Sequence, residues 1–194
     1  MSHISFFLKD TNAADTIPLK MVFYIAVTAC IILITVLSWN NMAPVYSGAQ
    51  DNRQLNSAAT ELMSIKSGYA RNLNSPNSPP GSMCTIGLSV DGIRYLAFGV
   101  DPDPNLTSDL NDSSWAREDN VIICQYETGT KERYYISGTP LEIRKGKLNE
   151  NGHWSIDHEY YFSKGPGVVI EGPIDGEFNF ELVHAEKVYV LSHF

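Results

Sequence analysis

Hydrophobic and polar positions first mark out an uncharged run near the N-terminus. The run from Met21 to Leu37 contains no charged residue, and only Thr28, Cys30 and Thr35 interrupt its apolar surface. At ~1.5 Å rise per residue it makes a helix about 26 Å long, close to the ~30 Å of a bilayer's hydrocarbon core. A core helix of a soluble domain normally keeps a polar stripe. The pattern therefore predicts a single helix that spans a membrane.

The flanks of this run favour a retained anchor over a cleaved secretory signal. A signal peptide has an apolar stretch of ~7–15 residues followed by a small-x-small cleavage site, whereas this run is longer and is followed by Trp39, a residue typical of the membrane interface. Lys9 and Lys20 precede the run, and the first basic residue after it is Arg53. Because basic flanks tend to stay in the cytoplasm, we expect the N-terminus inside and the rest of the chain outside.

A second helical pattern follows, from Ala49 to Asn72. Its apolar positions recur at helical spacing with polar residues between them, which predicts an amphipathic helix. Those positions are Leu55, Ala58, Ala59, Leu62, Ile65 and Tyr69. Pro44 and Gly48 either kink the chain between the two helices or lie within one long helix. A cluster of Asn, Ser, Pro and Gly at 74–81 then ends the helical pattern.

The remaining sequence has the short alternating runs of β-structure. Asp91-Gly92 between two such runs predicts a hairpin, and about nine strands are expected in all. The runs are Cys84–Val90, Ile93–Val100, Val121–Tyr126, Arg133–Ile136, Leu141–Ile143, Trp154–Phe162, Val168–Ile170, Phe178–Val183 and Val188–Leu191. The expected fold class is α+β, with a mainly antiparallel sheet that is curled or doubled into a sandwich.

These patterns divide the chain into four parts. We expect a cytoplasmic leader at 1–20, a transmembrane helix at 21–39, an amphipathic helical segment at 40–73 and an extracytoplasmic β-rich domain at 74–194. The leader's charges cancel, so the formal net charge of -8 belongs to the residues after the helix. An acidic domain repels nucleic acid and anionic headgroups, so we expect no nucleic-acid partner.

The order of these parts resembles an archaeal type IV pilin or pilin-like cell-surface protein. The resemblance includes Ala14, Thr16 and Pro18 just ahead of the apolar run. It implies that the apolar helices of like subunits associate as a filament core, and that a membrane peptidase removes the leader after a small residue, here Ala13 or Ala14. The chain differs from the family in having Pro18 and Lys20, and no glutamate, near the start of the apolar helix.

Motifs of catalysis are absent from the sequence. It has no Gly-x-Ser-x-Gly, no phosphate-binding Gly-rich loop and no His-Glu-x-x-His, and Gly165-Pro166-Gly167 is typical of a turn. His153 and Asp157 would share one face of the expected strand about 13 Å apart, too far for one metal ion. We therefore expect a protein that is not an enzyme.

Two cysteines fall in the expected β-domain. Cys84 and Cys124 form an even pair in an extracytoplasmic setting, which predicts a disulfide. Two buried free thiols are the alternative. Cys30 lies in the apolar helix, where a thiol behaves as a small apolar group.

The most polar segment suggests calcium as a cofactor. Oxygen-bearing side chains follow the 1, 3, 5, 7, 9, 12 spacing of a calcium loop at Asp101, Asp103, Asn105, Thr107, Asp109 and Asp112. Leu106 stands where such a loop needs Gly, and Asp112 where Glu is usual. A solvated acidic turn is the alternative. The same segment carries glycosylation sequons at Asn105 and Asn111.

Two hypotheses of function remain. The first is a non-enzymatic, pilin-like structural subunit, anchored in the membrane and associating with like subunits through its apolar helix. The second is a membrane-tethered binding module whose β-domain recognises calcium, a glycan or an envelope component.

Overall fold

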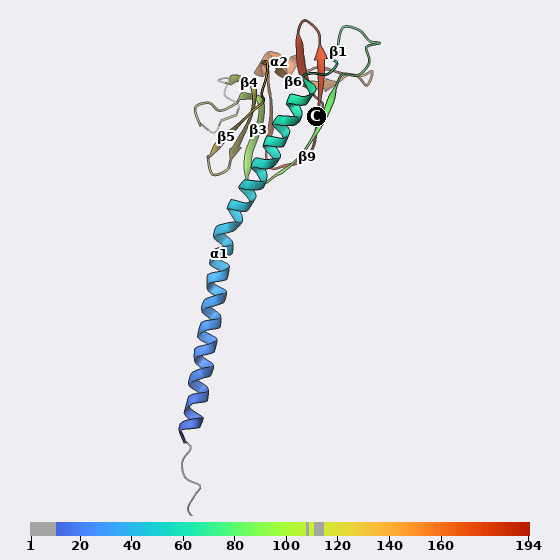
Figure 1. The fold of residues 1–194 in the computed structure, drawn as a ribbon. Helices are drawn as coiled ribbons and strands as arrows, with labels where there is room; N and C mark the ends of the chain where they lie inside the picture. The colour runs from blue at the N-terminus through green and yellow to red at the C-terminus, as the bar shows by residue number, and fades with distance from the viewer. Residues whose placement is uncertain (1–10, 108, 111–114) are drawn as a thin grey trace, which may run out of the picture. The chain divides into compact units, whose positions relative to one another are not determined.

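The computed structural model describes residues 11–107, 109–110 and 115–194, and the side chains of residues 11–19 and 39–48 lie outside this description. The chain divides into two compact units, Met1–Ala49 and Gln50–Phe194. Helix α1 (Thr11–Ile65) supplies residues to both units (Figure 1). The two helical patterns predicted from the sequence therefore both lie within the single helix α1.

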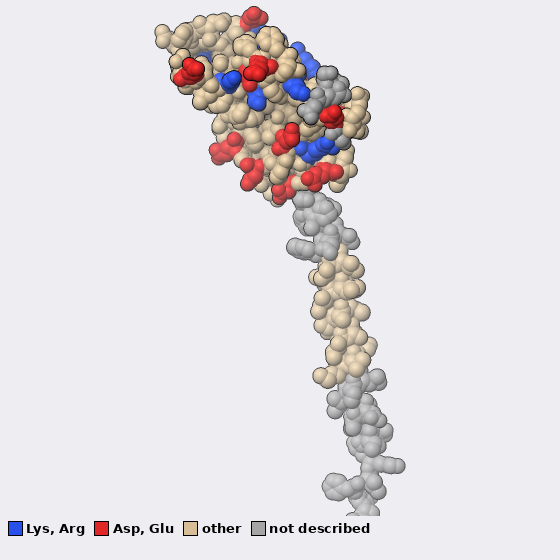
Figure 2. Space-filling model, turned by 180° about the vertical axis from the view of Figure 1, so that it is seen from behind, with Lys and Arg blue, Asp and Glu red and all other residues tan. Residues whose placement is uncertain are grey.

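In the first unit, the apolar segment (Lys20–Ser38) is helical throughout, and each of its side chains is exposed. The predicted apolar helix is therefore confirmed. Residues 21–38 carry no charge, whereas the second unit carries both acidic and basic side chains on its surface (Figure 2).

In the second unit, the end of α1 fills the space between two sheets. Leu55, Ala58 and Leu62 are at most 1% exposed, and Ile65 is 4% exposed. These side chains share one helix face, which packs on apolar residues from both sheets. The predicted amphipathic face is confirmed up to Ile65.

The helix ends before the predicted boundary at Asn72. Tyr69 lies outside it and is 53% exposed, so its predicted place on the buried face is wrong. The chain turns at Gly68, where a Cβ atom would lie 2.0 Å from the Ser82 hydroxyl oxygen. Lys66, just after the helix, donates to Asn120 and to the carbonyls of Ser137 and Thr139. These contacts hold the end of α1 against the loop that contains Ser137 and Thr139.

The strands form two sheets, which confirms the α+β class. The larger sheet is mixed, in the order β1-β9-β10-β6-β7, and β2 also pairs with β9. It contains β1 (Arg71–Asn72), β2 (Met83–Val90), β6 (Glu142–Leu148), β7 (Trp154–Ile156), β9 (Ile174–His184) and β10 (Val188–Ser192). The smaller sheet is antiparallel, in the order β5-β4-β3-β8, with β3 (Ile93–Asp101), β4 (Ala116–Tyr126), β5 (Lys131–Tyr135) and β8 (Val168–Glu171).

Parallel pairing in the larger sheet differs from the expectation of sequential hairpins. β10 pairs in parallel with β6, and β1 pairs in parallel with β9. The hairpin predicted at Asp91-Gly92 is also wrong, because β2 pairs with β9 while β3 pairs with β4 and β8. Asp91-Gly92 is still a turn, with a φ of 67° at Gly92, but it carries the chain from one sheet to the other.

The run predicted as a strand from Trp154 to Phe162 is a strand followed by a helix. β7 ends at Ile156, and α2 covers His158–Lys164. Asp157 caps this helix by accepting a hydrogen bond from the backbone N–H of Tyr160, and Gly165 closes it by donating to the Tyr161 carbonyl. The aromatic residues of this segment are typical of a strand, which explains the wrong prediction. The segment is a helix whose two ends are capped by Asp157 and Gly165.

A buried carboxylate ties three distant segments together at one end of the larger sheet. Glu181 on β9 accepts two hydrogen bonds of 2.7 Å from Arg71 and one of 2.8 Å from the backbone N–H of Gly81. His193 lies 3.0 Å away and stacks on Trp154. Burial raises the pKa of Glu181, but the bonds from Arg71, His193 and Gly81 outweigh it and lower that pKa to about 2.

Replacing Leu62 with Asp should destabilise the second unit by roughly 3 kcal/mol or more, because it would bury an unpaired charge between the sheets. Met63→Asp is the matched control, since Met63 is the next residue and is 41% exposed. Denaturant unfolding of the full chain in micelles measures both. Equal losses would show that the buried face is wrongly assigned.

Glu181 should make stability depend on acid pH. Its folded pKa of about 2 lies below the ordinary 4.5, so the carboxylate stabilises the fold above about pH 4.5 by about 3 kcal/mol, and this contribution is lost as the pH falls toward 2. Unfolding of wild type and Glu181→Gln should therefore differ most at neutral pH and converge near pH 2–3. The exposed Glu186→Gln serves as control, and a difference that stays constant with pH would contradict the prediction.

Candidate functional site

The apolar segment of α1 (Lys20–Ser38) is the first candidate functional feature of the molecule. Thr28 and Thr35 donate their hydroxyl protons to the carbonyls of Tyr24 and Ile31, each at 2.8 Å. The hydroxyl groups of these two threonines are thus satisfied within the helix. A helix whose threonine hydroxyls are paired internally, and whose exposed surface is largely apolar, is suited to lipid or to the apolar surface of other helices.

The predicted calcium loop follows β3, and the structure divides its residues into two kinds. Asp101 and Asp103 are buried, at 0% and 2% exposed, whereas Asn105, Thr107 and Asp109 are exposed. Asp112 lies outside the described residues. The first two carboxylates therefore do not belong to a solvated turn.

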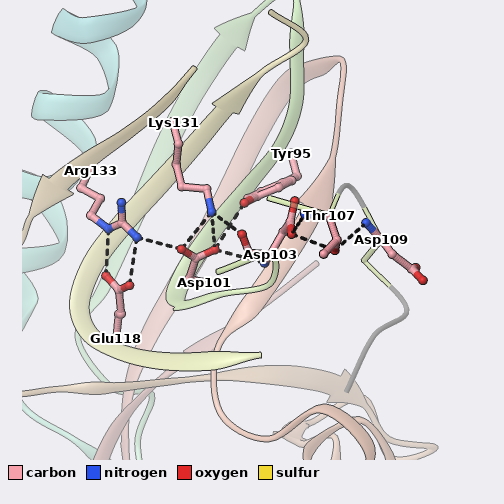
Figure 3. Close-up of polar contacts among 8 residues, drawn as sticks. All are labelled: Tyr95, Asp101, Asp103, Thr107, Asp109, Glu118, Lys131 and Arg133. Carbon is pink, nitrogen blue, oxygen red and sulfur yellow. Dashed lines mark hydrogen bonds and ion pairs between the residues drawn. The ribbon is translucent and has the colours of Figure 1, made fainter. Parts of the chain in front are cut away.

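Two cations from β5 hold the Asp101 carboxylate (Figure 3). Lys131 lies 2.8 and 3.0 Å from its two oxygens, and Arg133 lies 2.8 Å from the second of them. Tyr95 donates to the same carboxylate at 3.4 Å. Burial, together with the neighbouring Asp101 charge, raises the pKa of Tyr95, which keeps its phenol protonated as a donor.

Asp103 is used for local structure. Its carboxylate accepts from the backbone N–H of Thr107 at 2.7 Å and from the Thr107 hydroxyl at 3.1 Å, as Figure 3 shows. Its carbonyl accepts from Lys131 at 2.6 Å. In the described part of the chain, no three His, Cys, Asp or Glu side chains are grouped as metal ligands. Lys131 and Arg133 already neutralise the Asp101 carboxylate, which a calcium ion would need as a ligand. These contacts therefore give the calcium prediction no support.

The predicted disulfide is not formed. Cys84 on β2 and Cys124 on β4 are both free thiols, and their strands belong to different sheets. Burial raises the pKa of Cys84 to about 11 and that of Cys124 to about 12, so both remain protonated at neutral pH. Cys124 is buried in the core, whereas Cys84 is only partly buried and packs against that core.

The other sequence candidates lie apart from one another. Asn105 is exposed, as a glycosylation acceptor must be, and Asn111 lies outside the described residues. His153 is exposed between β6 and β7, and His158 is exposed at the start of α2. Because β7 ends at Ile156 and Asp157 caps α2, the strand spacing used for His153 and Asp157 does not apply.

Sequence reasoning missed a polar cluster on the outer face of the larger sheet. Glu142 on β6 is buried and bonds to Arg144, to Lys187 at 2.6 Å and to Arg117 at 3.1 Å. Burial raises the pKa of Glu142, but the bonds from Lys187 and Arg144 outweigh it and lower that pKa. The Glu-x-Arg spacing on a strand could have indicated the Glu142–Arg144 pair, since alternate residues share a face.

Arg144 is clamped between two tyrosine rings at the edge of a cavity. Its guanidinium carbon lies 4.3 Å from the ring centre of Tyr161 and 4.2 Å from that of Tyr189. The cavity has a volume of about 480 Å³ and is lined by residues from β6, β7, α2 and β10 and from neighbouring turns. No signal in the sequence joins these segments, because the tyrosines come from parts of the chain far from Arg144.

Neutralising Asp101 should destabilise the second unit strongly. Asp101→Asn removes the charge that Lys131 and Arg133 compensate, and breaking a buried ion pair typically costs about 3–5 kcal/mol. Asp119→Asn is the control, because Asp119 is only partly buried and its partner Arg117 is exposed, so the loss of this pair should cost about 1 kcal/mol or less. Both are measured by unfolding of the full chain. A higher melting temperature of the wild type in millimolar calcium than in chelator would contradict this account of Asp101.

Comparison with known proteins gives no relative from which a function could be transferred. No family model, no curated protein and no solved structure matches the chain. The likeness to pilins therefore depends on the order of the elements, an N-terminal apolar helix followed by a β-rich domain. No family is assigned.

Proposed function

We propose that this protein is a membrane-anchored, non-enzymatic surface protein and a pilin-like structural subunit. The apolar segment of α1 crosses the membrane, and the second unit lies outside. The exposed surface of Lys20–Ser38 is the observation that carries the proposal.

The composition of that surface supports a span in lipid. Phe23, Ile25, Ile31 and Leu33 are each 59–64% exposed, on a helix with no polar face. An apolar surface of this extent marks a membrane or protein contact. A buried core helix is a poor alternative, because none of this segment is buried.

Features of the second unit support a position in water. Its own core is closed by α1 and the two sheets, and its surface is charged. The basic residues before the apolar segment, Lys9 and Lys20, favour an N-terminus in the cytoplasm. The acidic second unit then lies on the opposite side.

The ion pairs of the buried carboxylates favour a structural role over catalysis. Asp101, Glu142 and Glu181 each face cations of the chain itself at close range. Such groups fix the positions of strands. A pilin-like subunit fits this arrangement, since its apolar helix would associate with like helices while its β-domain stays exposed.

Topology is tested by fractionation of cells that make the protein with a C-terminal tag. We expect the full chain in carbonate-washed membranes, and we expect protease added to intact cells to remove the tag. Ile25→Lys with Ile32→Lys should release the protein from membranes, since each charge near the helix centre costs about 2.5–3.5 kcal/mol of insertion free energy. Thr28→Ala is the control. Digestion only after lysis would show the reverse orientation.

Association through the helix is tested with the native Cys30, which is exposed in the apolar segment. Oxidation in intact membranes should link Cys30 residues of two copies into a dimer, and Cys30→Ala should abolish the dimer. Cys124→Ala should not, because Cys124 is buried. If oxidation yields only monomer at every protein density in the membrane, the proposed pilin-like assembly is overturned, and only the proposal of a membrane-anchored protein remains. Intact-mass measurement shows whether the residues before Asp15 are removed.

A further inference from the structure

The cavity beside Arg144 lies on the face of the larger sheet that is turned away from α1. Val190 and Leu182 belong to the core that packs on α1, whereas their neighbours Tyr189 and Leu191 belong to a separate apolar cluster on the other face. Helix α2 contributes residues to one wall, and the turns after β1 and β9 contribute to another. A volume of about 480 Å³ lies in the ~300–1,000 Å³ range of small-molecule sites.

Arg144 presents a fixed donor in this cavity. Its Nε is bonded to Glu142 and its Nη2 lies 3.4 Å from the Tyr161 hydroxyl, while the two tyrosine rings cover its faces. Its Nη1 has no hydrogen bond to any described residue, and its side chain is 13% exposed. A guanidinium that is already held in place can donate hydrogen bonds from its Nη1 to a ligand at little cost in conformational entropy.

Phe162 supplies an aromatic surface at the same cavity. It is 84% exposed, the highest value among the large exposed apolar side chains of the described residues, and it lies beside His158 and Tyr161 on α2. Its apolar ring therefore remains in water in the free protein. An exposed ring next to fixed polar groups favours a ligand that has both an apolar face and hydroxyl groups.

The charges around the cavity indicate a neutral ligand. Glu142 faces three cations, Arg144, Lys187 and Arg117. Asp119 pairs with Arg117 and Glu186 lines the cavity, so three carboxylates balance the three cations and no surplus positive charge attracts an anion. Asn74, Ser155 and His158 add neutral hydrogen-bonding side chains to the lining. We propose that this cavity binds a neutral saccharide, whose C–H face stacks on Phe162 and whose hydroxyl groups accept from Arg144. This binding would be an activity beyond the anchored structural role, and it does not depend on assembly.

The test uses the full chain in phosphatidylcholine nanodiscs, which carry no sugar headgroup. It is applied to an array of neutral and uronate-bearing oligosaccharides, and the neutral saccharide retained best is then titrated by calorimetry. Phe162→Ala should weaken this binding at least about tenfold. Tyr135→Ala is the matched control, because Tyr135 is 72% exposed on β5 in the other sheet and should bind as wild type does.

A second variant tests the role of Arg144. Arg144→Lys keeps a positive charge beside Glu142 but lacks the planar edge, so it should lose affinity while its melting temperature stays near that of wild type. Retention of no neutral saccharide, retention of uronates alone, or wild-type affinity in Phe162→Ala would each overturn the proposal. These results are independent of the fractionation and of the Cys30 cross-link, so either proposal can fail while the other holds.

Discussion

Packing of the last turns of α1 between two sheets is the interaction on which the second unit depends. Leu55, Ala58 and Leu62 are buried completely or nearly so, and they contact core residues from both sheets. Each sheet alone would leave an apolar face in water, and the helix covers both faces at once. Helix α1 also includes the apolar segment, so the exposed apolar residues and the residues that hold the second unit together belong to one element.

Buried carboxylates provide the second level of organisation, since each joins strands that apolar packing alone would leave free to shift. Asp101 connects β3 with β5, Glu142 connects β6 with the turn before β10, and Glu181 connects β9 with β1. In each case a cation of the chain meets the charge. The buried charges of Asp101, Glu142 and Glu181 are therefore compensated by cations of the chain, although the protein as a whole is acidic.

Features set by neighbouring residues could be predicted from the sequence, and features set by distant ones could not. The helix face from Leu55 to Ile65 follows from spacing alone. The turn at Asp91-Gly92 was also predictable, but the partner of β2 is β9, which the chain reaches much later. At Trp154–Phe162 the aromatic content favoured a strand, while Asp157 and Gly165 provided local signals for a helix that could have been recognised.

Candidate site residues follow the same division. The spacing from Asp101 to Asp112 suggested oxygen ligands, yet the partners of Asp101 are Lys131 and Arg133, which the antiparallel pairing of β4 and β5 brings back to it. Likewise, Arg144 meets Tyr161 and Tyr189 only once β6 and β10 are paired and α2 has packed on them. Without the topology, neither environment could be read from residue types.

The place of β10 has a consequence for the order in which the domain can form. It comes after every other described strand in the sequence, and it lies inside the larger sheet between β9 and β6. Until it has been synthesised, β6 and β9 have no shared neighbour, and the parallel pairing of β10 with β6 closes a long loop. Closure of the sheet is therefore a late event that follows synthesis of β10, and the apolar segment of α1 is made long before the second unit can fold.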